Sequence, residues 1–410
     1  MQRNLQKSLA FFAILAVINV GNAQDLRNVE EPKTPESCTS LKATGGDDTE
    51  VIQKALDSCT EGKAVALSSG VFYSGPLTIP SGVSLLVDSG VTLKAIPDPK
   101  LYDLGANTCG TLNEYGVGCR AFITMQEAKG SGIYGKGTID GQANVTMTGK
   151  NQTWWDLSLA AQKAHNYQNN PMLVKINKSM DITLYQITLI NSPFYTAAAY
   201  ETNGWTVWGL TILASVRNTD GIDPVGCQNV TITRCYISNG DDAVAIKALT
   251  APSRYISVVN IHIGSGNGFA IGSETNCGVR DVVVANITTI GTLTGINIKS
   301  NYFRGGTVEN IVFDNFCAIK ARRPVFLDMK MNNLQGPNMP VFRNITINNM
   351  YSLTKGIIAL HGISSSNSIE ATLHNVHIAK GSTYSEYHTK ITGEFEEDAT
   401  GTRCGTFGNE

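Results

Sequence analysis

The stretches N-V-T-I-T-R-C-Y-I (229–237) and Y-I-S-V-V-N-I-H-I (255–263) share one pattern, and this pattern decides the fold. Each starts at a polar residue, continues with alternating β-branched residues and ends in an isoleucine near a turn. Related units begin at Asp281 and Val308, so that consecutive starts from residue 229 lie 26, 26 and 27 residues apart. Such a period is typical of a solenoid, in which each coil buries its apolar face against its neighbours.

The same unit recurs near Met180, Val341 and Ile369, with asparagine often at a corner between coils. Because helices do not alternate with strands, a doubly wound sheet is excluded, and strand periodicity favours a β-solenoid over a helical array. We therefore predict an all-β fold, a single right-handed parallel β-helix that spans residues 24–410. The segment 49–58 is predicted to be a short helix that caps the N-terminal end, and Trp154 is placed in a polar loop.

The two ends of the chain have other compositions. Residues 1–23 have a basic start, an apolar run and small residues before position 24, which is typical of a signal peptide. The apolar run is too short to span a membrane comfortably, so we expect a secreted protein without a membrane partner. Beyond Tyr384 the chain is polar, and residues from about 390 to 410 are predicted to form a loosely attached tail.

Composition limits the function classes. A net charge of −2 and 16% charged residues give no basic field that would attract nucleic acid. With six scattered histidines and no C-x-x-C pair, we predict no metal site and no cofactor. The nine cysteines fit an oxidising compartment. Two local disulfides are predicted, Cys38 with Cys59 and Cys109 with Cys119. Pairing is left open for the other five, which are Cys227, Cys235, Cys277, Cys317 and Cys404.

Two acidic stretches suggest chemistry, R-N-T-D-G-I-D-P (217–224) and G-D-D-A-V-A-I-K (240–247). They place Asp220, Asp241 and Asp242 within 23 residues, among segments that read as strands. An isolated D-G is usually a turn signal. Neighbouring carboxylates, however, cannot all ionise easily, so one stays protonated while another remains charged. That division is the acid and base pair that breaks an acetal bond between sugars.

Four segments resemble one enzyme family: N-T-D-G-I-D-P, G-D-D-A-V-A-I-K, A-I-G-S-E-T (270–275) and G-I-N-I-K-S (295–300). Their residues and order resemble glycoside hydrolase family 28, the polygalacturonases, and are most similar to its secreted bacterial endo-acting members. The resemblance runs from about residue 41 to 389. It implies a right-handed parallel β-helix and inverting hydrolysis of α-1,4-linked galacturonate in pectin. The implied partner is thus a pectic polysaccharide, and we expect a monomer.

The resemblance also implies a role for each matched residue. Asp241 would be the general acid that protonates the glycosidic oxygen, and Asp220 and Asp242 would activate water from the opposite side. Lys299 would hold a galacturonate carboxylate as a point charge. Asn218, within N-T-D-G, would be a substrate-binding residue.

Three positions depart from the family pattern. Asn267 stands where the family has a histidine, Asn297 where it has an arginine and Met331 where it has a tyrosine. We include Asn267 and Asn297 among the predicted substrate-binding residues. The departures leave two alternatives to a working hydrolase. One is an impaired family member that binds pectin, or an inhibitor of pectinases, without turnover. The other is a non-catalytic adhesin.

Overall fold

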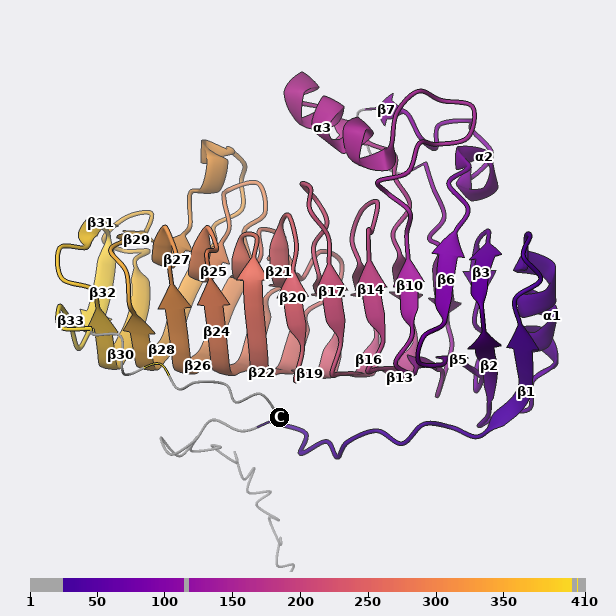
Figure 1. Ribbon diagram of the computed structural model, residues 1–410. Helices are drawn as coiled ribbons and strands as arrows, with labels where there is room; N and C mark the ends of the chain where they lie inside the picture. Colours follow the sequence, from indigo (N-terminus) through magenta and orange to yellow (C-terminus); the bar gives the residue numbers. More distant parts are fainter. Residues whose placement is uncertain (1–24, 114–117, 400–403, 405–410) are drawn as a thin grey trace, which may run out of the picture.

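The computed structural model describes residues 25–113, 118–399 and 404, so the predicted signal peptide and most of the chain beyond 399 lie outside the described residues. Over the described part the chain winds into one elongated parallel β-helix (Figure 1). Strands pair in parallel with the equivalent strand of the next coil. Val258, for example, pairs with Val284, which is one 26-residue repeat further along. The predicted fold class is confirmed.

Among the described residues, one sheet has eleven strands and carries the acidic residues. In chain order its strands are β4 (Leu77–Thr78), β8 (Ile123–Gln126), β12 (Val174–Asn177), β15 (Ala197–Tyr200), β18 (Ile222–Val225), β21 (Asp242–Ile246), β23 (Gly268–Ile271), β25 (Thr294–Lys299), β27 (Arg323–Asp328), β29 (Ile357–His361) and β31 (Thr383–Tyr387).

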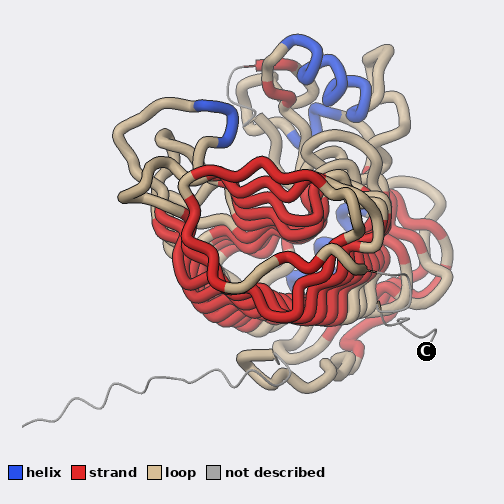
Figure 2. The backbone as a smooth tube through the Cα atoms, turned by 90° about the vertical axis from the view of Figure 1, so that its left-hand side faces the viewer, coloured by secondary structure: helices blue, strands red, loops and turns tan. Residues whose placement is uncertain are grey.

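The remaining long strands belong to a sheet of twenty that bends around the rest of each coil (Figure 2). These are β1 (Ser37–Lys42), β2 (Ala64–Ser69), β3 (Val71–Ser74), β5 (Ser84–Val87), β6 (Thr92–Ala95), β9 (Gly132–Tyr134), β10 (Thr138–Asp140), β13 (Met180–Tyr185), β14 (Thr188–Ile190), β16 (Asn203–Trp208), β17 (Thr211–Leu213), β19 (Gln228–Thr233), β20 (Tyr236–Ser238), β22 (Ser253–Ser265), β24 (Val279–Ile290), β26 (Thr307–Ile319), β28 (Val341–Ser352), β30 (Ile369–Ile378), β32 (Thr389–Thr392) and β33 (Phe395–Glu396). A separate antiparallel pair joins β7 (Leu112–Asn113) to β11 (Tyr167–Gln168).

The core consists of side chains stacked coil upon coil. Ile232, Val258, Val284, Phe313 and Ile347 follow one another in register through five strands, and each is at most 1% exposed. Burying one such side chain contributes roughly 1.5–3 kcal/mol. The alternating β-branched pattern of the sequence therefore becomes continuous apolar stacks along the axis.

The corners between strands are made by asparagines, as the sequence pattern suggests. Asn260, Asn286 and Asn315 all have left-handed φ angles, between 52° and 59°. Their side-chain amides form a ladder, in which Asn286 donates to Asn260 at 3.0 Å and Asn315 donates to Asn286 at 2.9 Å. Asparagine adopts this backbone region at a lower cost than most residues.

Helix α1 (Thr49–Ser58) covers the N-terminal end of the solenoid, as predicted (Figure 1). Ile52 and Leu56 are fully buried on its inner face. The side chain of Gln53 accepts from the backbone N–H of Thr78 and donates to its carbonyl. The cap therefore satisfies polar backbone groups that an exposed sheet edge would leave unpaired.

The polar loop predicted around Trp154 is instead helix α3 (Trp154–Ala164), and this prediction was wrong. A capping box between Thr153 and Asp156 starts the helix. Trp154 is buried and meets Tyr102 of the short helix α2 (Pro99–Tyr102) edge to face. The helix has only three turns and a weak apolar stripe, which the strand periodicity on either side conceals.

The C-terminal region is better ordered than predicted. Strands β31, β32 and β33 pair in parallel with the preceding coil, so the chain continues the solenoid up to residue 396. Ile391 and Phe395 pack against the core from these otherwise polar strands. A disulfide joins Cys317 to Cys404. Two apolar anchors and one cross-link thus attach a segment whose composition suggested a loose tail.

The other cysteines divide into two kinds. Cys38 forms a disulfide with Cys59, and Cys109 with Cys119. The other described cysteines carry free thiols, which are buried at Cys227 and Cys235 and exposed at Cys277.

The segment from residue 25 to 36 runs in extended form along the outside of the solenoid (Figure 1). The backbone N–H of Leu26 donates to Ser257 Oγ at 2.8 Å. Among the described residues, none of the helices has the length and apolar character needed to cross a membrane.

Candidate active site

The predicted acids meet at the start of two adjacent strands. Asp223 lies within β18 and Asp242 is the first residue of β21. Asp241 comes immediately before β21, and Asp220 lies two residues before β18. Parallel pairing of Ile222 with Val244 fixes the two strands side by side. Asp220, Asp223 and Asp242 are at most 4% exposed, whereas Asp241 is partly exposed. The spacing of the two acidic stretches is thus one coil of the solenoid.

A lysine that the sequence analysis did not single out holds two of these acids. Lys247 Nζ lies 2.8 Å from Asp220 Oδ2 and 3.0 Å from Asp223 Oδ2, and all three side chains are buried. The ammonium also lies 4.3 Å from the centre of the Tyr195 ring. Its signal was present in the G-D-D-A-V-A-I-K stretch. Lys247 pairs with Val225, which shares a face of its strand with Asp223 two residues earlier.

Burial and this lysine act on the acids in opposite directions. Burial raises the pKa of Asp220 well above its usual range, against the lowering effect of Lys247. Burial likewise raises the pKa of Asp223 to about 6, again opposed by Lys247. For Lys247, burial favours the neutral amine, but the two carboxylates prevail and its pKa lies well above the usual value. The group therefore takes up and releases protons as a unit.

Asp242 has its own lysine. Lys299 Nζ lies 2.7 Å from Asp242 Oδ2, and the lysine side chain is only 12% exposed. Burial raises the pKa of Asp242, and Lys299 is the strongest opposing influence. Lys299 was predicted to hold a substrate carboxylate. In the structure its ammonium forms an ion pair with Asp242. An ammonium has three donors, so others remain for a ligand.

Asp241 is positioned by three N–H donors. Its Oδ1 accepts from Asn267 Nδ2 at 2.7 Å and from the backbone N–H of Asp242 at 3.0 Å. Its Oδ2 accepts from the backbone N–H of Asn218 at 2.8 Å. Two donors saturate Oδ1, while a lone pair remains on Oδ2. The backbone of Asn218 therefore orients Asp241, and the Asn218 side chain accepts from Gln168 at 3.2 Å.

Several buried oxygens at this site have no hydrogen-bond donor among the described residues. They include Oδ1 of Asp220, Asp223 and Asp242. An unpaired buried acceptor costs about 1–3 kcal/mol, and most such groups in proteins are satisfied. In each of these carboxylates a lysine holds Oδ2, and the unpaired Oδ1 is suited to accept a hydrogen bond from a ligand hydroxyl or a water molecule.

Two of the three departures from the family pattern lie on or beside the strands of this sheet. Asn297 lies on β25 between Ala270 of β23 and Phe326 of β27, is 3% exposed, and has no described donor to its Oδ1. Asn267 contacts Asp241 directly. Met331, in the single turn η1 (Met331–Asn333), is partly exposed. The structure thus brings Asn267 to Asp241 and places Asn297 two residues before Lys299, the partner of Asp242.

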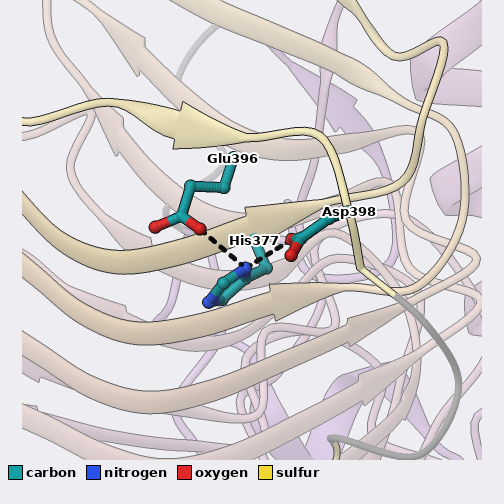
Figure 3. A group of neighbouring side chains, drawn as sticks. All are labelled: His377, Glu396 and Asp398. Atoms are coloured by element: carbon teal, nitrogen blue, oxygen red, sulfur yellow. Dashed lines mark hydrogen bonds and ion pairs between the residues drawn. The ribbon is translucent and has the colours of Figure 1, made fainter.

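One group of described residues has the composition of a metal site, and it lies elsewhere. The ligand atoms of His377, Glu396 and Asp398 lie within 4.8 Å of one another at the C-terminal end of the solenoid (Figure 3). His377 Nδ1 is 2.5 Å from Asp398, and Nε2 is 2.7 Å from Asn375 Oδ1. Both ring nitrogens are therefore already in hydrogen bonds, and the one to Asp398 ties the segment that follows β33 to β30.

Comparisons with known proteins identify the family and support the fold. The family model described as glycosyl hydrolases family 28 matches residues 59–394. An endo-polygalacturonase of Pectobacterium carotovorum is 44% identical over 369 residues, which cover 88% of this chain and 92% of that protein. A polygalacturonase of Ralstonia solanacearum is 35% identical and covers 78% and 68%. The solved structure of the Erwinia carotovora polygalacturonase superposes with a TM-score of 0.88 at 43% identity, covering 90% of this chain and all of that one.

Proposed function

Since the chain belongs to glycosyl hydrolases family 28, we propose that it is a polygalacturonase that hydrolyses α-1,4-galacturonosyl linkages in pectin with inversion. The observation that carries the proposal is the arrangement of Asp220, Asp241 and Asp242. One carboxyl group is held by neutral N–H donors, and the other two are held by lysines. The two environments supply the two roles that this reaction needs.

Asp241 is the proposed general acid. Its Oδ2 accepts a single hydrogen bond, so one lone pair can carry a proton. Asp241 is also less buried than Asp220 and Asp242. The proton passes from Oδ2 to the glycosidic oxygen as the bond from that oxygen to the anomeric carbon breaks. The amide of Asn267 orients the acid without a charge of its own. This hydrogen bond supports positioning of Asp241 despite the departure from histidine.

Asp220 and Asp242 are the proposed bases. A water molecule that donates to Oδ1 of either carboxylate loses its proton there as its oxygen attacks the anomeric carbon from the opposite face. Burial raises the pKa values of these carboxylates, and Lys247 and Lys299 oppose that rise because each ammonium stabilises the ionised form. The lysines therefore determine the pH above which the bases work.

The substrate is held by groups adjoining the acids. The ammonium of Lys299 has donors beyond the one used by Asp242, and we assign one of them to a galacturonate carboxylate. The Oδ1 of Asn297 accepts from a sugar hydroxyl, which removes the cost of leaving it unpaired. The amide of Asn267 and the backbone of Asn218 contribute through Asp241. The enzyme acts outside the cell as a monomer, and the three disulfides fit that compartment.

The test follows new reducing ends during incubation with polygalacturonic acid and with pectins of graded methylation. We expect turnover by the wild type and at least a hundredfold loss in Asp241→Asn, since a general acid contributes roughly 10²–10⁴ in rate. Asp57→Asn, an exposed change on α1, serves as the matched control and should retain full activity. Absence of wild-type turnover on every substrate refutes the proposal, and so does full activity of the Asp241→Asn variant.

A further inference from the structure

A row of side chains continues from the acids toward the C-terminal end of the same sheet. Parallel register places Lys299 beside Asp328, Asp328 beside His361 and His361 beside Tyr387, on four successive strands. Lys299 is the lysine that holds Asp242. Three inter-strand spacings cover roughly 15 Å, which exceeds the length of one sugar ring. The row therefore leads away from the acids along the sheet.

Aromatic rings connect this row into one surface. The rings of His361 and Tyr387 are stacked, with centroids 4.6 Å apart and planes within 7°. Phe326, which pairs in register with Asn297, meets His361 edge to face at 6.1 Å. His361 is fixed further by a 2.9 Å hydrogen bond between Nε2 and Ser385 Oγ. The rings thus pack against one another in a fixed arrangement along the sheet.

Two cations lie on these rings. The guanidinium carbon of Arg323 is 4.7 Å from the centre of the Phe326 ring, and Lys330 Nζ is 5.1 Å from the centre of the Tyr387 ring. Among the residues that the structure describes, neither cation has an ion pair or a side-chain hydrogen bond. Asp328, the acid within the row, instead accepts the backbone N–H of Lys330 and lies 3.8 Å from His361 Nδ1. Both cations are thus positioned by aromatic contacts while their N–H donors remain available.

We propose that Arg323, Phe326, Lys330, His361 and Tyr387 form a distal binding platform for an acidic oligosaccharide. The rings hold the two cations in place, and the cations take carboxylates of uronate residues beyond the cleavage site. The proposal rests on the proposed function, because it assumes that the polymer crosses the acids and continues along the same row. Phe326 adjoins Asn297, so no gap in the sheet separates the platform from the acids.

Binding is measured by calorimetry in the Asp241→Asn background, so that no substrate is consumed. Galacturonate oligomers of increasing length are titrated into this protein and into the further variants Arg323→Gln, Lys330→Gln and Tyr387→Ala. Lys390→Gln is the matched control, because it also removes one positive charge at this end of the molecule but lies on β32 in the other sheet. Fully methyl-esterified oligomers of equal length test the need for carboxylates.

We expect each platform variant to raise the Kd of long acidic oligomers about tenfold, a loss of roughly 1.4 kcal/mol. The control, the shortest oligomers and the methyl esters should show no such change. Unchanged Kd values for long oligomers overturn the proposal, and so does an equal loss for the shortest oligomers or the methyl esters. Binding does not require turnover. A wild type without hydrolytic activity would therefore refute the proposed function, while the Kd values would still test the platform.

Discussion

Replacing Lys247 by methionine removes the charge that two buried carboxylates share. The change keeps the length of the side chain but leaves Asp220 and Asp223 without their partner at 2.8 and 3.0 Å. Breaking a buried ion pair by removing one member costs about 3–5 kcal/mol. At pH 7 we therefore expect Lys247→Met to lower the free energy of unfolding by that amount and to abolish activity.

The dependence on pH distinguishes this cause from a packing defect. Without Lys247 the pKa values of Asp220 and Asp223, already raised by burial, must rise further. A carboxyl group whose folded pKa exceeds its unfolded value destabilises the protein only as pH rises above the unfolded value. At pH 4 both groups are protonated in the variant, so the remaining cost is that of unpaired polar atoms, about 1–3 kcal/mol.

The assay is urea unfolding of wild type and variant at pH 4 and pH 7. We expect the gap between them to be about 2 kcal/mol larger at pH 7. Lys63→Met is the control, since its exposed pair with Glu36, at 3.9 Å, should contribute less than about 1 kcal/mol at either pH. An equal loss at both pH values would show that Lys247 acts through packing, and the electrostatic reasoning would fail.

Three further predictions follow from single contacts. The folded pKa of Asp223, about 6, exceeds its usual 3.8. Wild type should therefore lose about 2 kcal/mol of unfolding free energy between pH 4 and pH 6 that Asp223→Asn does not lose, as measured by urea unfolding of both proteins at the two pH values. Asn286→Ala should cost about 2–3 kcal/mol, since it loses ladder amides and strains a φ of 56°. Asn286→Gly relieves the strain and should unfold at higher urea than the alanine variant. Asn267→Ala should lower kcat about tenfold by freeing Asp241, whereas unchanged kinetics would exclude a positioning role.

The fold could be predicted because the sequence pattern that produces it repeats in every coil. The 26-residue period at Asn229 and Tyr255 imposes the same apolar stacking on every coil, so many weak local signals agree. Helix α3 lacked such support, since three turns with one buried tryptophan leave little periodicity to detect. The C-terminal strands were hidden for a related reason, because only Ile391 and Phe395 mark their inner faces.

The acids of the site could be predicted from the sequence, whereas the lysines that pair with them could not. Asp220, Asp241 and Asp242 stand in a recognisable order, but the partner of a buried charge depends on register between coils. Lys247 reaches Asp223 because it pairs with Val225 of β18, which lies on the same face of that strand as Asp223. Sequence separation alone does not reveal that pairing, nor that Lys299 is engaged with Asp242.

The parallel register of the eleven-stranded sheet has a consequence for how such a protein changes over evolutionary time. Each coil contributes one position to the row that begins at Lys299, and each coil packs only on its neighbours. Duplicating or deleting one coil beyond β27 would lengthen or shorten the row by about 4.8 Å, while every neighbour of Asp241 stayed in place. The reach of the molecule along a polymer and the chemistry that cuts it are therefore inherited as separate modules, and a lineage can alter the first without risk to the second.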